Sequence, residues 1–196
     1  HGLYTLLASR MVKETGRVVA FEPSPRERRR LRKHVWINRC ANVRIEEFAL
    51  GKAPGLDHLY VVRGRETGCN SRRPPVNAGT TTLLPVRVTS LDEYCRANLI
   101  GTVDFIKLDA EGAELEILEG MTDILAGPQR PLFLCEVDDH RTQPWGYPSK
   151  RILEYLKERR YEWFGLRADG APVSLDRKEC YNLLAVPVER VHILGL

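Results

Sequence analysis

The chain has 196 residues and a mass of 22.4 kDa, which is most simply one domain with a substantial core. Its hydrophobic fraction of 43% and charged fraction of 29% are typical of a globular protein, and no apolar run reaches the ~18 residues of a membrane-spanning helix. The 5 cysteines are odd in number, scattered and form no C-x-x-C pair, so neither a disulfide framework nor a zinc site is indicated. We therefore expect a single domain, 1–196, in the cytoplasm.

Apolar residues alternate between strand and helix periods along most of the chain. In chain order the sequence predicts a helix at 3–12, a strand at 17–21, a helix from residue 24, strands at 42–50, 58–62 and 84–90, a helix from residue 90, a strand at 103–108, a helix at 115–121, a strand at 131–137, a helix at 150–160 and strands at 161–166 and 181–187. The segment at about 63–82 is rich in Gly, Pro, Ser, Thr and Asn and predicts a long, variable surface loop. No helix separates the last two strands, so we expect a parallel α/β sheet with an antiparallel hairpin at its C-terminal edge.

Serines mark three of the predicted helix starts. Ser24 precedes a proline and is followed by Glu27, and Ser90 is followed by Glu93, so both match the S-x-x-E capping box. Ser149 is the expected N-cap of the helix at 150–160.

The net charge of +4 owes much to one basic run, RERRRLRK at 26–33. Such a run can bind nucleic acid, or it can be the solvated face of a helix. No aromatic residue interleaves the run to stack on bases. We favour the solvated face and do not expect nucleic acid as a partner.

Acidic residues end three of the predicted parallel strands: Glu22, Asp109 and Glu136. Ligands of open parallel sheets bind at the carboxyl ends of the strands. An acidic residue that ends the second strand of a mononucleotide-binding half can accept both ribose hydroxyls, so Glu22 is either such an acceptor or a simple surface carboxylate.

The stretch VDFIKLDAEGAELEILEGM, at 103–121, crowds charged residues around one glycine. Strand alternation places Lys107 and Asp109 on one side. Glu111 either lines a site or stabilises the first turn of the following helix, where negative charge is favourable. Gly112 permits a close approach of the backbone. The other acidic residues of the stretch are expected on the solvated helix face: Glu114, Glu116 and Glu119.

A second acidic cluster lies at 136–140. Its carboxylates and His140 could hold Mg²⁺ or Mn²⁺, but adjacent residues of an extended segment point opposite ways, so a metal site is not the favoured interpretation. Glu136 or His140 could instead act as a general base. Trp145, just beyond, could wall a substrate pocket or anchor a packed loop.

Several segments, in order, resemble the FkbM family of S-adenosylmethionine-dependent methyltransferases. These are FEPSP at 21–25, ALG at 49–51, SLDEY at 90–94 and, most specifically, DFIKLDAEGAELEILEGM at 104–121. The opening HGLYTLLAS is similar to the tail of the family's glycine-rich cofactor loop. Together the matching segments extend from residue 1 to about residue 137.

The resemblance implies a Rossmann-like class I methyltransferase sheet, mostly parallel with an antiparallel C-terminal strand. It implies S-adenosyl-L-methionine as the cofactor and O-methylation of a hydroxyl on a small molecule, a sugar or another natural product. The cofactor-binding residues would be Gly2 in the cofactor loop, Glu22 on the ribose, Phe48 and Ala49 at the edge of the adenine pocket, and Asp109 near the methionine end. The candidate catalytic residues are Asp109, Glu111, Glu136 and His140.

The first strand of that fold, with the earlier glycines of the cofactor loop, is not in this sequence. A central parallel strand supplies hydrogen bonds to both neighbours, so we expect the chain to be N-terminally truncated. Other functions stay open: an NAD-linked oxidoreductase, which Glu22 would serve equally well, a nucleic-acid methyltransferase, or a degenerate cofactor-binding or scaffold domain.

Overall fold

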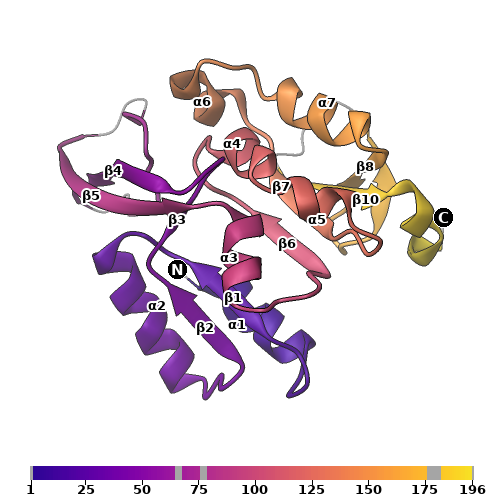
Figure 1. Ribbon diagram of the computed structural model, residues 1–196, viewed down its shortest axis with the longest axis horizontal. Helices are drawn as coiled ribbons and strands as arrows, with labels where there is room; N and C mark the ends of the chain where they lie inside the picture. The colour runs from indigo at the N-terminus through magenta and orange to yellow at the C-terminus, as the bar shows by residue number, and fades with distance from the viewer. Residues whose placement is uncertain (1, 65–67, 76–78, 176–181, 196) are drawn as a thin grey trace. The chain divides into compact units, whose positions relative to one another are not determined.

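A computed structural model describes residues 2–64, 68–75, 79–175 and 182–195. The chain divides into two compact units, His1–Thr89 and Ser90–Leu196, and Figure 1 labels their α-helices and all their strands except β9. Among the described residues, no helix is both long and apolar enough to cross a membrane. The fold is an α/β arrangement with mixed sheets.

The first unit begins with a helix–strand–helix–strand segment, as the apolar periods predict. Its elements are α1 (Leu3–Met11), β1 (Val18–Phe21), α2 (Pro25–Ile37) and β2 (Val43–Glu46). β1 and β2 pair in parallel, with Val18 opposite Val43. Parallel pairing requires a crossover connection, and α2 provides it.

The strand predicted at 42–50 is wrong as a single element. The chain leaves the first sheet after Glu46, and the short β3 (Ala49–Leu50) joins a second sheet of order β3-β5-β4. There β3 runs parallel to β5 (Thr81–Thr89), which is antiparallel to β4 (Gly55–Val62). The reason is packing: Ala49 is buried in the core of this second sheet, with Leu59, Val61, Val86 and Val88.

The described part of the predicted loop at about 63–82 packs against β4. Tyr60 and Ser71 exchange two backbone hydrogen bonds, and the Asn70 side chain accepts the Val62 N–H at 3.0 Å. Arg72 is buried and pairs with Asp57 at 2.9 Å. These contacts fold the segment back onto the strand that precedes it. Residues 65–67 and 76–78 of the predicted loop lie outside the described residues.

The second unit contains a five-stranded sheet of order β6-β7-β10-β8-β9. Its strands are β6 (Phe105–Leu108), β7 (Leu132–Glu136), β8 (Tyr161–Leu166), β9 (Pro172–Ser174) and β10 (Asn182–Pro187). Its helices are α3 (Leu91–Ala97), α4 (Glu114–Glu119), α5 (Thr122–Ala126), α6 (Asp139–Thr142) and α7 (Lys150–Glu158), with short 3₁₀ turns η1 (Gln143–Trp145) and η2 (Val188–Leu194).

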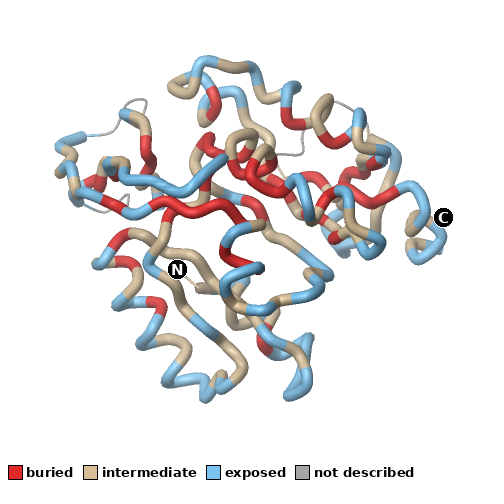
Figure 2. The backbone as a smooth tube through the Cα atoms, in the orientation of Figure 1, coloured by how far each residue is buried: buried red, intermediate tan, exposed pale blue. Residues whose placement is uncertain are grey.

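The last strand is antiparallel, as predicted, but it is not at the edge of the sheet. β6 and β7 are parallel, and β10 lies between β7 and β8, antiparallel to both. The short β9, which the sequence did not predict, forms the outer edge beside β8. A central place suits β10 because its apolar run can be buried on both faces. Ala185 and Val186 are fully buried, as are Phe133 and Cys135 of β7, and Figure 2 shows this buried centre.

The predicted helix caps differ in outcome. The Ser90 side chain accepts the Glu93 N–H at 3.2 Å, as predicted. Ser24 and Ser149 are at N-cap positions, but neither side chain makes the capping hydrogen bond. Glu27 is fully buried and pairs with flanking arginines, so the first capping box is wrong.

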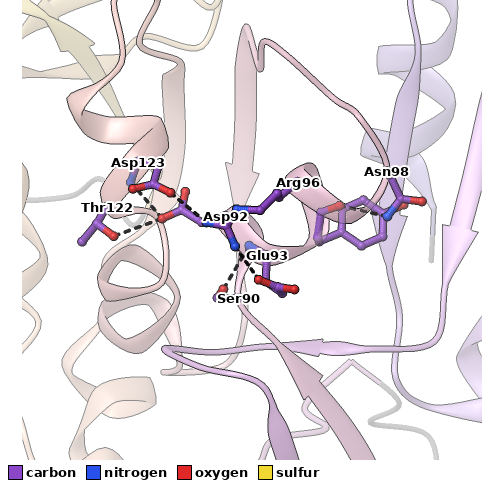
Figure 3. Close-up of polar contacts among 8 residues, drawn as sticks. Ser90, Asp92, Glu93, Arg96, Asn98, Thr122 and Asp123 are labelled. Atoms are coloured by element: carbon purple, nitrogen blue, oxygen red, sulfur yellow. Dashed lines mark hydrogen bonds and ion pairs between the residues drawn. The ribbon is translucent and has the colours of Figure 1, made fainter.

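Asp92, in the SLDEY segment, joins two helices of the second unit. Its carboxylate accepts the Thr122 hydroxyl at 3.1 Å and the N–H groups of Asp123 and Ile124 at 2.8 and 3.1 Å, as Figure 3 shows for the first two residues. These donors are at the start of α5, where backbone N–H groups have no partner within the helix. Asp92 therefore has a structural role, linking α3 to α5.

Candidate active site

Lys107 and Asp109 lie on one side of the chain at the end of β6, as strand alternation predicts. The Lys107 ammonium is 3.0 Å from the Asp109 carboxylate and donates a hydrogen bond of 2.9 Å to the Asn182 side chain on β10. Lys107 is mostly buried, whereas the Asp109 side chain is 39% exposed. The Asp109 carboxylate at the end of β6 is therefore accessible to solvent or a ligand, and Lys107 fixes its orientation.

The chain then makes a tight turn at Glu111 and Gly112, both with positive φ, 53° and 94°. A side chain on Gly112 would place its Cβ 2.0 Å from the Arg141 carbonyl oxygen and 2.5 Å from the Trp145 ring. The close approach predicted for Gly112 is confirmed. Because only glycine fits here, the turn brings the backbone directly against the segment after β7.

Side chains from that segment hold the turn. The Trp145 indole N–H donates to the Glu111 carbonyl at 3.1 Å, and the Tyr147 hydroxyl donates to the Gly112 carbonyl at 2.6 Å. The Arg141 guanidinium is 2.9 Å from the Glu111 carboxylate. The loop-anchor interpretation of Trp145 is confirmed. Arg141 and Tyr147 were not predicted, because no local pattern marks residues about 30 positions from the turn that they hold.

The interpretation of Glu111 as part of a helix's first turn is wrong. Helix α4 begins at Glu114, three residues later, and the positive φ of Glu111 is incompatible with a helix. Burial raises the pKa of Glu111 to about 7, an effect that Arg141 opposes and the Asp109 charge reinforces. Glu111 is therefore a half-buried carboxyl that titrates near neutral pH.

Glu114 is not on a solvated face, contrary to prediction. It is 1% exposed, and one carboxyl oxygen accepts the Ala110 N–H at 2.7 Å and the Gly112 N–H at 3.3 Å. The other oxygen is buried without a hydrogen-bond partner among the described residues. Burial raises the pKa of Glu114. The two other acidic residues expected on that face, Glu116 and Glu119, are half-buried.

Glu136, at the end of β7, joins the same group of carboxyls. Burial is the main cause that raises the pKa of Glu136 to about 8, and the negative charges of Asp109, Glu111 and Glu114 contribute to the same rise. Its Oε2 is also buried with no hydrogen-bond partner in the described parts of the chain. Asp109, Glu111, Glu114 and Glu136 form what we call the acidic cluster. A carboxyl with a pKa near 8 is suited to proton transfer near neutral pH.

The interactions described for His140 are with Asp138 and Asp139 and not with the acidic cluster. Its side chain is exposed, its backbone N–H donates to Asp138 at 2.9 Å, and its charge acts on Asp139. Asp138 caps α6, and Asp139 accepts the Ser149 N–H at 2.7 Å. Within the described ranges, no three His, Cys, Asp or Glu side chains are grouped so that they could hold a metal ion.

In the first unit, Glu22 directly follows β1. Its backbone N–H continues the pairing with β2, and its carboxylate accepts the Ser24 N–H at 2.9 Å. Burial raises the pKa of Glu22 to about 7, more than this hydrogen bond lowers it. The Ser24 hydroxyl is fully buried and has no partner among the described residues. Two polar groups with unused hydrogen-bonding capacity therefore meet at the end of β1.

The other predicted cofactor residues of this unit lie in different surroundings. Gly2 has a φ of 86° at the start of α1, and a Cβ there would be 2.7 Å from Leu31 of α2. Phe48 is half-buried, and the Arg87 guanidinium lies over its ring at 4.7 Å. Ala49 is a core residue.

Comparison with known families identifies the chain. The family model of the methyltransferase FkbM domain matches residues 2–163. The chain belongs to the FkbM methyltransferase family. The match includes the whole acidic cluster, whereas Asn182, which holds Lys107, lies beyond it.

A solved structure is also similar to this FkbM-family chain. It is the crystal structure of methyltransferase FkbM from Methylobacillus flagellatus KT, with 17% sequence identity and a TM-score of 0.46. The similarity covers 86% of this chain and 36% of that chain, so the FkbM-family chain described here spans about a third of that protein's length. No curated protein matches the chain.

Proposed function

We propose that this chain is part of an S-adenosylmethionine-dependent methyltransferase that methylates a hydroxyl group of a small molecule, a sugar or another natural product. Membership of the FkbM family supports methyl transfer. The observation that carries the choice of a hydroxyl is the acidic cluster, with a pKa of about 8 for Glu136. A hydroxyl is a weak nucleophile that gains from a nearby base, and a base works best when its pKa is near the working pH.

The residues at the end of β1 fit the proposed cofactor. A ribose offers two hydroxyl donors, and the Glu22 carboxylate can accept both in charge-assisted hydrogen bonds. The buried Ser24 hydroxyl, without a partner among the described residues, could bond the same group. Gly2, Phe48 and Ala49 would border the cofactor's loop and adenine, and Asp109 would face its methionine end. When bound, the cofactor supplies a methyl group on a sulfonium.

The protein's own contribution would be positioning and proton transfer. Lys107, held by Asn182, orients the Asp109 carboxylate. Arg141 pairs with the Glu111 carboxylate, which would face the acceptor. Glu136 would take the proton that the acceptor hydroxyl loses on methylation. His140, exposed at the start of α6, is the alternative proton acceptor.

We also propose that residues 1–196 form one methyltransferase domain of the Rossmann-like class I type. Three features support this: the parallel pair β1–β2, the parallel pair β6–β7, and the antiparallel β10 beside β7. The loop near 63–82 would help to select the acceptor.

The test has two stages. Calorimetry should first show that the full chain binds S-adenosylmethionine and not NAD, which separates a methyltransferase from an NAD-linked oxidoreductase. Transfer of a labelled methyl group to a panel of hydroxyl compounds should then rise between about pH 7 and 9 as Glu136 loses its proton. Glu136→Gln should abolish this rise, whereas Glu158→Gln, on an exposed helix end, should keep it. Cofactor binding with methylation of amines alone would overturn the choice of a hydroxyl.

A further inference from the structure

The two units carry opposite charge. His1–Thr89 contains 17 Lys and Arg against 7 Asp and Glu, a net charge of +10, whereas Ser90–Leu196 contains 13 against 19, a net charge of −6. The overall charge of +4 conceals this separation. A surface of one sign raises the local concentration of ligands of the opposite sign. The first unit is therefore suited to a polyanion, a property that the proposed methyl transfer does not use.

Helix α2 gathers cations on one exposed face. With about 3.6 residues per turn, Arg29, Arg32, Lys33 and Trp36 share one side of the helix. All of them are exposed, and Trp36 is 79% exposed. We call these residues the α2 stripe. The opposite side of the helix is turned inward, with Leu31 buried.

The cations of the α2 stripe form no ion pair with any residue that the structure describes. Other arginines of the basic run are engaged: Arg26 and Arg30 pair with Glu27, and Arg28 donates to the Glu22 carbonyl at 2.9 Å. Like charges three or four residues apart destabilise a helix. The α2 stripe therefore lowers stability unless an anion binds to it.

Trp36 gives the α2 stripe a second recognition element. Unpaired cations contact phosphates, and an exposed aromatic ring stacks on a base, which together bind single-stranded nucleic acid. From Arg29 to Trp36 the stripe extends ~10 Å at a rise of ~1.5 Å per residue, the length of about three stacked nucleotides. The sequence analysis found no aromatic residue within the basic run, because Trp36 lies three residues beyond it. Only the helix brings Trp36 to the same face as the cations.

We propose that the α2 stripe is a docking surface for single-stranded RNA or DNA. An anionic membrane surface fits it less well, because a helix that lies in the interface needs a broad apolar face. The apolar side of α2 is directed inward instead, with Leu31 6% exposed. The single ring of Trp36 can stack on a base while the neighbouring cations contact the phosphates on either side of that base.

The test measures fluorescence anisotropy of a labelled oligo(U) of about 20 nucleotides with the full chain over a range of salt. Three phosphate contacts predict that log affinity falls with log salt with a slope of about −2. Removing two of them in Arg32→Gln/Lys33→Gln should weaken binding about twentyfold at 0.1 M salt and bring the slope to about −0.7. The matched control Arg151→Gln/Lys157→Gln removes the same charges from α7 and should bind like wild type.

The stacking element is tested separately. Trp36→Ala should weaken binding about fivefold or more with an unchanged salt slope, and Trp36→Phe should retain most of the affinity. Circular dichroism confirms that each variant is folded. The proposal is overturned if the oligonucleotide does not bind, or if stripe and control variants bind alike. It is also overturned if stripe-dependent binding is seen with phosphatidylserine vesicles and not with the oligonucleotide. None of these outcomes depends on S-adenosylmethionine binding, which the stripe variants should keep.

Discussion

Replacing Glu22 by Gln separates the energetic effect of burying this carboxyl from its proposed role in binding. Burial raises its pKa from 4.5 to about 7, so the folded protein binds the proton more tightly than the unfolded chain. The contribution to stability is then fully present below about pH 4.5 and is lost as the pH rises through about 7. Gln keeps an oxygen that can accept the Ser24 N–H but carries no charge.

The magnitude follows from the two pKa values. A difference between 4.5 and about 7 corresponds to about 3 kcal/mol at pH 8 and less than about 1 kcal/mol at pH 5. The free energy of unfolding of Glu22→Gln minus that of wild type should therefore increase by about 3 kcal/mol between pH 4 and pH 8. For a chain of this size that corresponds to about 6–12 °C in melting temperature at pH 8.

Urea unfolding of wild type and variant at several pH values measures this difference, and every other titrating group is common to both proteins. Glu158→Gln makes the same chemical change at an exposed position and controls for it. A stability difference that does not grow between pH 5 and pH 8 would refute the burial argument. The same variant should bind S-adenosylmethionine about tenfold more weakly, since it lacks the charge that ribose hydroxyls would bond. Unchanged affinity would remove Glu22 from the proposed cofactor site and leave the burial argument intact.

Three further substitutions test individual contacts by urea unfolding. Gly112→Ala should lower the free energy of unfolding by at least about 3 kcal/mol, because its Cβ would overlap a backbone carbonyl 2.0 Å away. Gly170→Ala is also at positive φ but in open space and should lower it by only about 1 kcal/mol. Equal losses in the two variants would contradict the overlap at Gly112. Asp92→Ala should cost about 1–2 kcal/mol by uncapping α5, whereas Asp123→Ala, with an exposed side chain, should cost little. Tyr147→Phe should lower the free energy of unfolding by about 1 kcal/mol, because the hydrogen bond of 2.6 Å is lost. It should also lower the rate of methyl transfer more than the affinity for the cofactor. An unchanged rate of transfer would show that the contact is purely structural.

Patterns within about ten residues of each other were sufficient to predict much of the fold. The apolar runs that became β1, β6 and β7 are recognisable because side-chain period and burial are properties of the local backbone. Ser90 capped its helix as expected, with a donor three residues away, whereas Ser24 and Ser149 show that the local pattern alone does not ensure the capping bond. The family segment at 104–121 likewise located Asp109 and Glu111 in sequence, and Glu136 followed from its place at a strand end.

The state of those carboxyls was decided by tertiary structure. Whether Glu114 is solvated or buried depends on what packs over α4, and the pKa of Glu136 depends on charges contributed by the turn after another strand. Lys107 is held by Asn182, which is 75 residues away in sequence. Such effects depend on desolvation and on distances between segments far apart in the chain, which no local period encodes. The central place of β10 has the same origin: its apolar run requires cover on both faces, and only assembly of the sheet decides which strands provide it.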